Sequence, residues 1–437
     1  MSARVLIPAA AALAAVGLLG GCAATSSGAR TAGQAANAAP GASASSRVGS
    51  GGSRAVPAAS CASSSAGAVG DTAPALQAIQ FVDQGHGWAA GAGRIMATSD
   101  GGRTWTRQYS GTAAVAQLDF TDAAHGWAAG QGTLLRTTDG GATWTALPVP
   151  ALSGHCLALG SVHFVSPDLG YAIAASTGAA SAGTASAGAA STGAASAGAG
   201  APGADGRLLR TTDGGVTWAP VPGAPASPQA VCFSSPRDGY VGGPGRIWRT
   251  TDGGATWSLA FTEPAAAGRA PAAGPLAGDA PELGCAGQDA AWVLFLGPGA
   301  AMLHAPYLAY ATKDGRAWHG VLEETTLESA LRPALHLPDG PGTEPGPFSV
   351  ISADAAAFVG YTPPANGWGA APLDMATNGG STLTRAGDVP AVNEPLAAAF
   401  LTPAQGWVVG ENLKTGRFAI EATTNAGRTW TTQYATS

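Results

Sequence analysis

Apolar and polar residues alternate in short runs along most of the chain, and Gly-rich turns separate these runs from about residue 75 to residue 437. In one such region Phe120 closes a run, Trp127 lies in the next, and Leu134 and Leu135 lie in a third. No stretch keeps an apolar stripe of helical period over the length that a helix needs. The pattern therefore predicts short β-strands joined by tight turns.

One unit of about 40 residues recurs along this region. A plain copy has one aromatic residue, a second aromatic seven positions later in a Gly-Trp or Gly-Tyr pair, and a closing turn of the form Ser/Thr-x-Asp-x-Gly-x-Thr-Trp. Four copies are plain, and they begin at Phe81, Phe120, Phe164 and Phe233. The spacing of seven identifies three weaker copies, with the pairs Cys285 and Trp292, Tyr361 and Trp368, and Phe400 and Trp407.

Seven units with room for four short strands each predict an all-β fold, a seven-bladed β-propeller with four-stranded blades over residues 75–437. A parallel β-helix or a two-sheet sandwich is the alternative, and it is disfavoured because solenoid repeats are usually shorter and more even. Residues 176–206, which are mostly Ala, Gly, Ser and Thr, interrupt the third unit as a low-complexity insertion.

Composition narrows the choice of function. Charged residues make up 11% of the chain, 21 basic and 27 acidic, against roughly 25% in an ordinary soluble domain. This balance excludes a basic nucleic-acid binder. The hydrophobic content of 46% with 12 Trp is enough for a sizeable core.

The closing turn resembles the BNR or Asp-box repeat, which occurs in sialidases, in sortilin-type receptors and in the photosystem II assembly-factor propellers. Each carboxylate can accept hydrogen bonds from its own turn, and Asn can still accept them, so we expect these residues to be structural. One carboxylate per turn makes a poor calcium cage, so neither a metal nor a cofactor is expected. The predicted box residues are Asp100, Asp139, Asp213, Asp252, Asp314, Asn378 and Asn425.

An Asp-box propeller could be an enzyme, a secreted glycoside hydrolase of the sialidase type. Such enzymes resemble one another in a Phe/Tyr-Arg-Ile-Pro segment near the start. The nearest strings here begin at Gly93 and Gly245, and both lack the aromatic residue and the proline. The spacing also singles out no pair of carboxylates for glycoside hydrolysis. We therefore expect no catalytic residues and keep the hydrolase as the alternative.

The repeat as a whole looks most like the photosystem II stability and assembly-factor family, and the resemblance covers all seven units. It implies a non-catalytic propeller, a monomer, that binds an exported or membrane protein on the outer face of a membrane. Arg136, Arg210 and Arg249 stand directly before the box in three consecutive units. Either their stems cover apolar surface, or they form a partner-binding row that resembles the family's basic patch.

The N-terminus predicts export. Arg4 precedes an apolar, Ala-rich stretch that ends in Leu19-Gly20-Gly21-Cys22, which resembles the lipobox of bacterial lipoproteins. Residues 1–21 are then a signal peptide, and Cys22 carries a diacylglycerol that anchors the chain to the outside of the cell membrane. The alternatives are an ordinary secretory signal or a membrane span, for which the stretch is short. Residues 22–70, rich in Ala, Gly and Ser, read as a flexible tether.

Four further cysteines are expected in an extracytoplasmic compartment, where disulfides persist. Aligning the units puts Cys285 at the position of Phe233, so Cys232 stands one residue earlier and points to the opposite face of its strand. Opposite faces of adjacent blades meet, so we predict a bond from Cys232 to Cys285. This leaves Cys61 to pair with Cys156, with free buried thiols as the alternative for all four.

The lipobox generates a direct test of location. Metabolic labelling with a palmitate analogue should mark the wild-type protein and not the Cys22→Ala variant, because the thiol is the atom that takes the lipid. Equal labelling of the two proteins would refute the lipid anchor.

Overall fold

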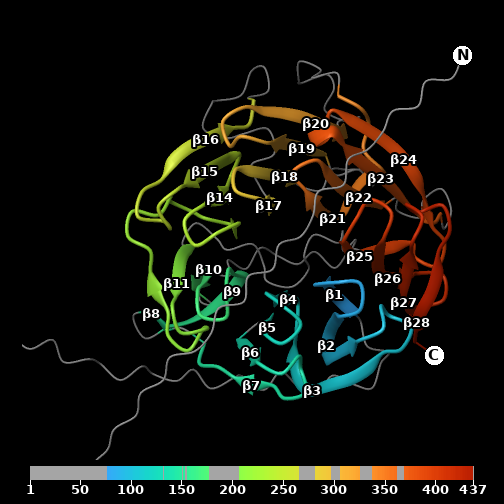
Figure 1. Ribbon diagram of the computed structural model, residues 1–437, viewed down its shortest axis with the longest axis horizontal. Helices are drawn as coiled ribbons and strands as arrows, with labels where there is room; N and C mark the ends of the chain where they lie inside the picture. Colours follow the sequence, from blue (N-terminus) through green and yellow to red (C-terminus); the bar gives the residue numbers. More distant parts are fainter. Residues whose placement is uncertain are drawn as a thin grey trace, which may run out of the picture. The chain divides into compact units, whose positions relative to one another are not determined.

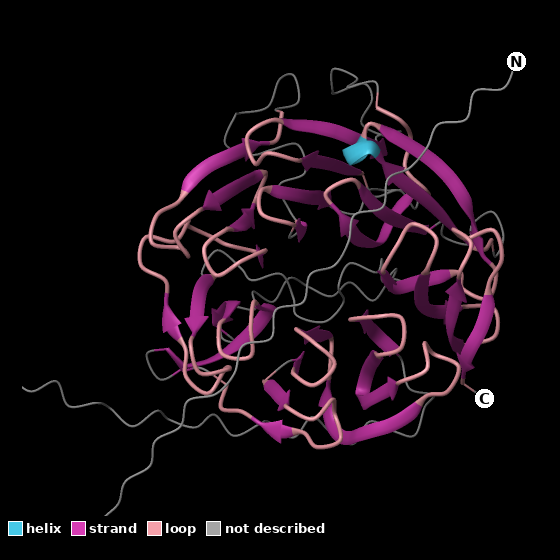
Figure 2. Cartoon of the chain, viewed as in Figure 1, coloured by secondary structure: helices cyan, strands magenta, loops and turns pink. Residues whose placement is uncertain are grey.

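The computed structural model describes residues 76–130, 132–149, 151–152, 155–176, 206–264, 281–296, 306–324, 337–361 and 369–436. These residues form seven antiparallel sheets that follow one another around a central channel (Figure 1). Apart from one short 3-10 turn, η2 (Asn378–Gly380), the described residues are strands and loops (Figure 2). The predicted all-β, seven-bladed propeller is confirmed.

The first four blades take the chain from residue 76 to residue 262. Blade 1 contains β1 (Leu76–Phe81), β2 (Gly87–Thr98) and β3 (Thr106–Ala114). Blade 2 contains β4 (Gln117–Phe120), β5 (Gly126–Gly130), β6 (Thr133–Thr137) and β7 (Thr145–Ala146). Blade 3 adds a short strand that pairs with the start of β9, and it contains β8 (Ala151–Leu152), β9 (His155–Phe164), β10 (Gly170–Ser176), β11 (Arg207–Thr211) and β12 (Ala219–Pro220). Blade 4 contains β13 (Ala230–Phe233), β14 (Gly239–Gly243), β15 (Arg246–Thr250) and β16 (Ser258–Thr262).

Three blades complete the ring. Blade 5 contains β17 (Glu282–Ala286), β18 (Ala290–Leu296), β19 (Tyr307–Thr312) and β20 (Trp318–Glu324). Blade 6 contains β21 (Glu344–Ser352), β22 (Ala355–Tyr361), β23 (Ala371–Thr377) and β24 (Thr382–Val389). Blade 7 contains β25 (Glu394–Phe400), β26 (Gly406–Asn412), β27 (Arg417–Thr423) and β28 (Thr431–Ala435). The innermost strands β1, β4, β9, β13, β17, β21 and β25 contact one another in sequence, and β25 contacts β1.

Blade 1 keeps the four-stranded plan although its sheet has three strands. The first part of β2 pairs with β1, and its second part pairs with β3. Gly93, with φ of +68°, lies inside β2 where Gly132 of blade 2, with φ of +64°, turns the chain between β5 and β6. A residue with a side chain is strained at such an angle, so glycine allows the hairpin to be this tight.

Blade 6 differs from the sequence alignment. We expected Tyr361 and Trp368 to be its aromatic pair, but Tyr361 closes β22, the second strand, and Trp368 lies outside the described residues. The innermost strand β21 (Glu344–Ser352) comes earlier in the chain than the pair that the spacing selected. Val350 pairs with Ala356 there, as Phe120 pairs with Gly126 in blade 2. The spacing of the two aromatics could not locate this blade correctly, because blade 6 has no aromatic residue at either repeat position.

The core lies between blades. Six of the Gly-Trp or Gly-Tyr aromatics are at most 2% exposed, namely Trp88, Trp127, Tyr171, Tyr240, Trp292 and Trp407. At four interfaces this ring stacks on the first aromatic of the next blade, with centroids 3.5 to 3.7 Å apart, in the pairs Trp88 with Phe120, Trp127 with Phe164, Tyr171 with Phe233, and Trp407 with Phe81. The last pair joins blade 7 to blade 1.

The Asp-box turn is a closed hydrogen-bond network. Asp139 Oδ1 accepts from Thr137 Oγ1 at 2.8 Å and from Thr143 N at 2.9 Å, and Asp139 Oδ2 accepts from Thr143 Oγ1 at 2.6 Å. Thr137 Oγ1 in turn accepts from Gly141 N at 2.7 Å. Because the network uses both carboxylate oxygens within one turn, the box shapes the hairpin. The same bonds recur around Asp100, Asp213 and Asp252.

The other three boxes are variants of this network. Asp314 accepts from the N–H groups of Arg316 and Ala317, because its turn is one residue shorter. Asn425 keeps the full pattern, accepting from Thr429 N through Oδ1 and donating to Thr429 Oγ1 through Nδ2. Asn378 donates to Thr382 Oγ1 and opens η2 with a φ of +56°.

The network has a pH dependence that can be measured. Hydrogen bonds from Thr143, and from its counterparts Thr104 and Thr256, lower the pKa of Asp139, Asp100 and Asp252 to about 2. A lowered folded-state pKa stabilises the fold above the unfolded value of 3.8, and this contribution is lost as the pH falls toward 2. Replacing Asp100, Asp139, Asp213 and Asp252 together by Asn should therefore flatten the decline of the thermal unfolding midpoint between pH 5 and pH 2.

The control is the matching Asp→Ala variant, which removes the acceptor and should lower the midpoint at pH 7 as well. Asn425 shows that an amide can hold the same turn. An Asn variant with the acid sensitivity of the wild type would contradict the assignment.

Candidate functional site

The three arginines of the predicted row lie beside the buried aromatics of their own blades. Arg136 pairs with Trp127 across the sheet, Arg210 with Tyr171, and Arg249 with Tyr240. The guanidinium carbons stand 5.7, 6.0 and 5.9 Å from the respective ring centroids. A cation over an aromatic face is attracted by the ring quadrupole, which explains why a charged side chain is tolerated between blades.

Two of these guanidinium groups are bonded to the next blade. Arg136 donates to Pro167 O at 3.3 Å and to Asp213 O at 3.4 Å. Arg249, whose side chain is 13% exposed, forms an ion pair with Asp289 and donates to Asp314 O at 3.5 Å. Both residues therefore fasten one blade to the turn of the following one.

Arg210 differs from both neighbours. It is exposed, and among the described residues its guanidinium contacts only the Tyr171 ring. Tyr171 itself donates through its hydroxyl to Gly253 O of blade 4, at 3.1 Å. Arg210 is therefore the member of the row whose charge is available at the surface.

A second set of polar residues lies on innermost strands around the central channel, a cavity of about 470 Å³ bounded by strands of all seven blades. Three of them, Gln80, Asp119 and His163, line the cavity. These side chains stand directly before the first aromatic position of their blades and face the following blade. Each hydrogen-bonds to the channel-side backbone of the next innermost strand, and we call such a side chain an edge cap. The edge caps are Gln80, Asp119, His163 and Ser349.

The caps use different chemistry for the same purpose. Gln80 makes two bonds to Phe120, accepting from its N–H at 2.8 Å and donating to its carbonyl at 3.2 Å. His163 Nε2 carries a proton toward Phe233 O at 2.7 Å, because a carbonyl can only accept. Ser349 Oγ accepts from Phe400 N at 2.9 Å. An innermost strand is an edge strand, so these bonds pair backbone groups that would otherwise have no protein partner.

Asp119 is the charged member of this set. Its carboxylate accepts a hydrogen bond from Phe164 N. Burial raises the pKa of Asp119 to about 6, and the nearby His163 and the Phe164 N–H act in the opposite direction. The carboxylate is thus committed to the backbone of β9, which is a structural use of a group with a perturbed pKa.

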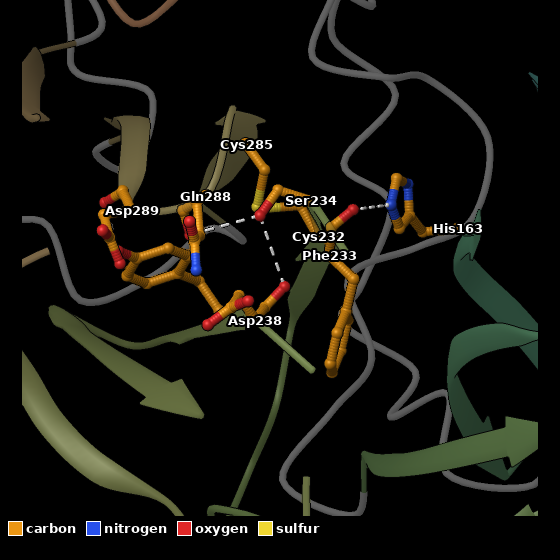
Figure 3. The surroundings of a disulfide bond; sticks show 9 residues. His163, Cys232, Phe233, Ser234, Asp238, Cys285, Gln288 and Asp289 are labelled. Carbon is orange, nitrogen blue, oxygen red and sulfur yellow. Dashed lines mark hydrogen bonds between the residues drawn. A yellow bond between two sulfur atoms is a disulfide. The ribbon is translucent and has the colours of Figure 1, made fainter. Parts of the chain in front are cut away.

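At the interface of blades 4 and 5, a disulfide stands where other interfaces have an edge cap and the first aromatic of the next blade. Cys232 stands at the edge-cap position, Cys285 stands where five blades have Phe, and a disulfide joins them with a Cα–Cα distance of 5.7 Å (Figure 3). Ser234 Oγ donates to Gln288 O at 3.4 Å beside it. This is the pairing that the strand-parity argument allows. Cys61 lies outside the described residues, so its bond to Cys156 in β9 stays a prediction.

The sequence analysis missed the four edge caps. Gln, Asp, His and Cys precede the first aromatic in blades 1 to 4, a polar or reactive position beside an otherwise apolar strand end. That regularity was the available signal. It was passed over because the residue type changes from blade to blade.

Within the described ranges, no group of three or more His, Cys, Asp or Glu side chains is placed to hold a metal ion. The half-buried His86 and His125 each bond through Nδ1 to a nearby carboxylate, Asp83 at 2.9 Å and Asp122 at 3.0 Å. Within the same ranges no helix is long and apolar enough to cross a membrane. Cys22, the expected lipid site, lies outside them.

The fold and its turns define an Asp-box β-propeller. Residues 68–160, which reach from before β1 into β9, match the family model of the Photosynthesis system II assembly factor YCF48. The resemblance to the photosystem II assembly-factor propellers is therefore confirmed over this part of the chain. No curated protein matches the chain.

Solved structures with similar architecture include two assembly factors and one enzyme. "YCF48 bound to D1 peptide" is 16% identical, with 81% of this chain and 95% of that chain covered and a TM-score of 0.48. YCF48 from Cyanidioschyzon merolae is 17% identical, with coverages of 72% and 83% and a TM-score of 0.42. The GH74 xyloglucanase from Xanthomonas campestris is 15% identical, with coverages of 83% and 54% and a TM-score of 0.51, so it shares the fold.

The disulfide generates a stability test. Replacing Cys232 and Cys285 by Ser should lower the free energy of unfolding by about 4 kcal/mol on the chain-entropy model, because the bond closes a loop with a sequence separation of 53. Denaturant unfolding measures the change, and reduced wild-type protein should match the variant. Recovery of both cysteines in alkylated form from unreduced protein would exclude the bond.

Proposed function

We propose that this protein is a non-catalytic scaffold that binds an exported or membrane protein outside the cytoplasm. The observation that carries the proposal is the match of residues 68–160 to the assembly-factor family model. Two features support it. The propeller offers a rigid frame with exposed loops, and Arg210 offers a surface charge on blade 3.

The carboxylates of four Asp-boxes and of Asp119 have structural uses, which favours binding over catalysis at these residues. Four box carboxylates are committed to their own turns, and Asp119 in the channel is committed to the backbone of β9. A hydrolase of the two-carboxylate type needs a pair set apart for acid and nucleophile or base. The fold shared with a xyloglucanase at 15% identity carries no chemistry across. The sialidase-like hydrolase stays the alternative, and glycoside turnover by the purified protein would favour it.

The membrane location rests on the N-terminal sequence. A lipid on Cys22 would hold the chain outside the cell membrane, and residues 22–70 would connect that anchor to the propeller. Such an arrangement brings the propeller close to other exported or membrane proteins, which agrees with a scaffold role.

Arg210 allows the binding proposal to be tested with a matched control. Arg210→Glu should weaken binding of the partner by about tenfold, because a charge contact at the surface is reversed. Arg207→Glu is the control, since Arg207 is exposed on the same strand three residues away. The partner is first identified by cross-linking in cells and mass spectrometry, and affinities are then measured with purified proteins. Equal affinities for both variants and wild type would remove Arg210 from the interface.

A further inference from the structure

The edge caps follow a register rule. Gln80 pairs with Trp88 in the sheet of blade 1, and Phe81 pairs with Gly87. Asp119 and Phe120 take the same two places in blade 2, and His163 and Phe164 take them in blade 3. Along an antiparallel strand, the backbone N–H and C=O groups of successive residues point alternately toward the paired strand and away from it. Because Phe120 N–H and C=O reach Gln80, this position turns its backbone toward the channel.

Two junctions lack a polar edge cap. At the junction of blades 5 and 6, Gly284 pairs with Trp292 and holds the position, and Val350 of β21 fills the space that a side chain would take there. The other is the junction of blades 7 and 1. Ala399 pairs with Trp407 and therefore stands at the edge-cap position of blade 7. Ala397, two residues earlier, corresponds to Gln117, whose amide binds β9 through Gly160 O and Val162 N. Both alanines pack against the cluster that contains Phe81 and Ile79 of blade 1. An alanine has no side-chain donor or acceptor, so neither Ala397 nor Ala399 can hydrogen-bond to the edge of β1 through its side chain.

The channel edge of β1 is consequently unlike that of β4. The amide of Gln80 presents to Phe120 one acceptor and one donor, the same pair that a peptide group of an added strand would present. At β1 the corresponding residue is the half-buried Ala399, which has neither group. Ile79 and Ala397 beside it line the channel of about 470 Å³. The volume lies within the range of sites that hold small ligands or short peptides. Backbone groups on an open strand edge are a template for another extended chain.

We propose that the channel edge of β1 binds an extended segment of a partner protein by strand addition, through the backbone groups of Ile79 and Phe81. This inference rests on the proposed function and adds the location and the mode of binding. Recognition at this edge is through backbone groups, because Ala397 and Ala399 offer a ligand no side-chain donor or acceptor. The specificity is thus for an extended backbone, with little dependence on side-chain charge.

The test installs the missing cap. Ala399→Gln should occupy the β1 edge as Gln80 occupies β4, and should weaken the binding of an extended peptide about tenfold or more, because two backbone hydrogen bonds are lost. The probes are short peptides selected from a random phage-displayed library on the full-length wild-type protein. Ala404→Gln, in an exposed loop of the same blade, is the matched control and should bind as the wild type does.

Two further measurements are specific to strand addition. N-methyl groups on alternate residues of a selected peptide should abolish binding at one parity and be tolerated at the other. Hydrogen exchange at the Phe81 and Ile79 amides should be faster than at Phe120 in the free protein and should slow when peptide binds. Gln80→Ala uncaps β4, and in the Ala399→Gln background it should restore peptide binding. This double variant and the exchange data keep the test decisive should Ala399→Gln fold poorly.

The outcomes separate the two proposals. Selected peptides that bind wild type and Ala399→Gln equally would overturn the β1 site and leave the scaffold function standing. Failure to select any peptide, with unchanged exchange at Phe81, would also overturn the β1 site, while the scaffold function would still be decided by the cross-linked partner. Loss of binding in Ala399→Gln together with the N-methyl parity supports strand addition at β1.

Discussion

The contact between a buried aromatic and the following blade holds this ring together. At four interfaces the ring of one blade stacks on a Phe of the next, and its polar atom donates to a box glycine there, from Trp88 to Gly140, Trp127 to Gly214, Tyr171 to Gly253 and Trp407 to Gly101. The sheets bury their apolar faces only through these neighbours. The Asp-box, by shaping the accepting turn, therefore contributes to an interface as well as to its own hairpin.

Interfaces that lack this aromatic stack are held by other interactions. Tyr240 meets no Phe in blade 5, and its interface carries the disulfide and the Arg249 ion pair with Asp289. Trp292 still donates to Ser352 O of blade 6, at 3.0 Å, although blade 6 lacks both repeat aromatics. A disulfide, an ion pair or a hydrogen bond can thus join adjacent blades in place of the aromatic stack. This explains how a repeat can lose its aromatic residues while the ring of blades stays closed.

The sequence predicted the fold well because the repeat residues have local roles that spacing reveals. Trp127 and Asp139 recur at set distances, since each serves one blade in the same way. Blade 6 was aligned wrongly because Tyr361 and Trp368 matched the spacing by coincidence. The edge caps escaped notice because Gln80 and His163 share a position and a target, and no chemical type. The role of such a residue depends on the backbone group of the next blade that it contacts, and the sequence alone does not show that contact.

The ring closes without an exchange of strands. Blade 1 is built from the first described strands and blade 7 from the last, so every blade is one continuous piece of chain. The Trp407 and Phe81 stack at this junction has the same geometry as the stacks between covalently consecutive blades. The contacts between blades therefore do not depend on which blade comes first in the chain. Circular permutation at any loop between blades would preserve each sheet and leave the order of neighbours around the channel unchanged.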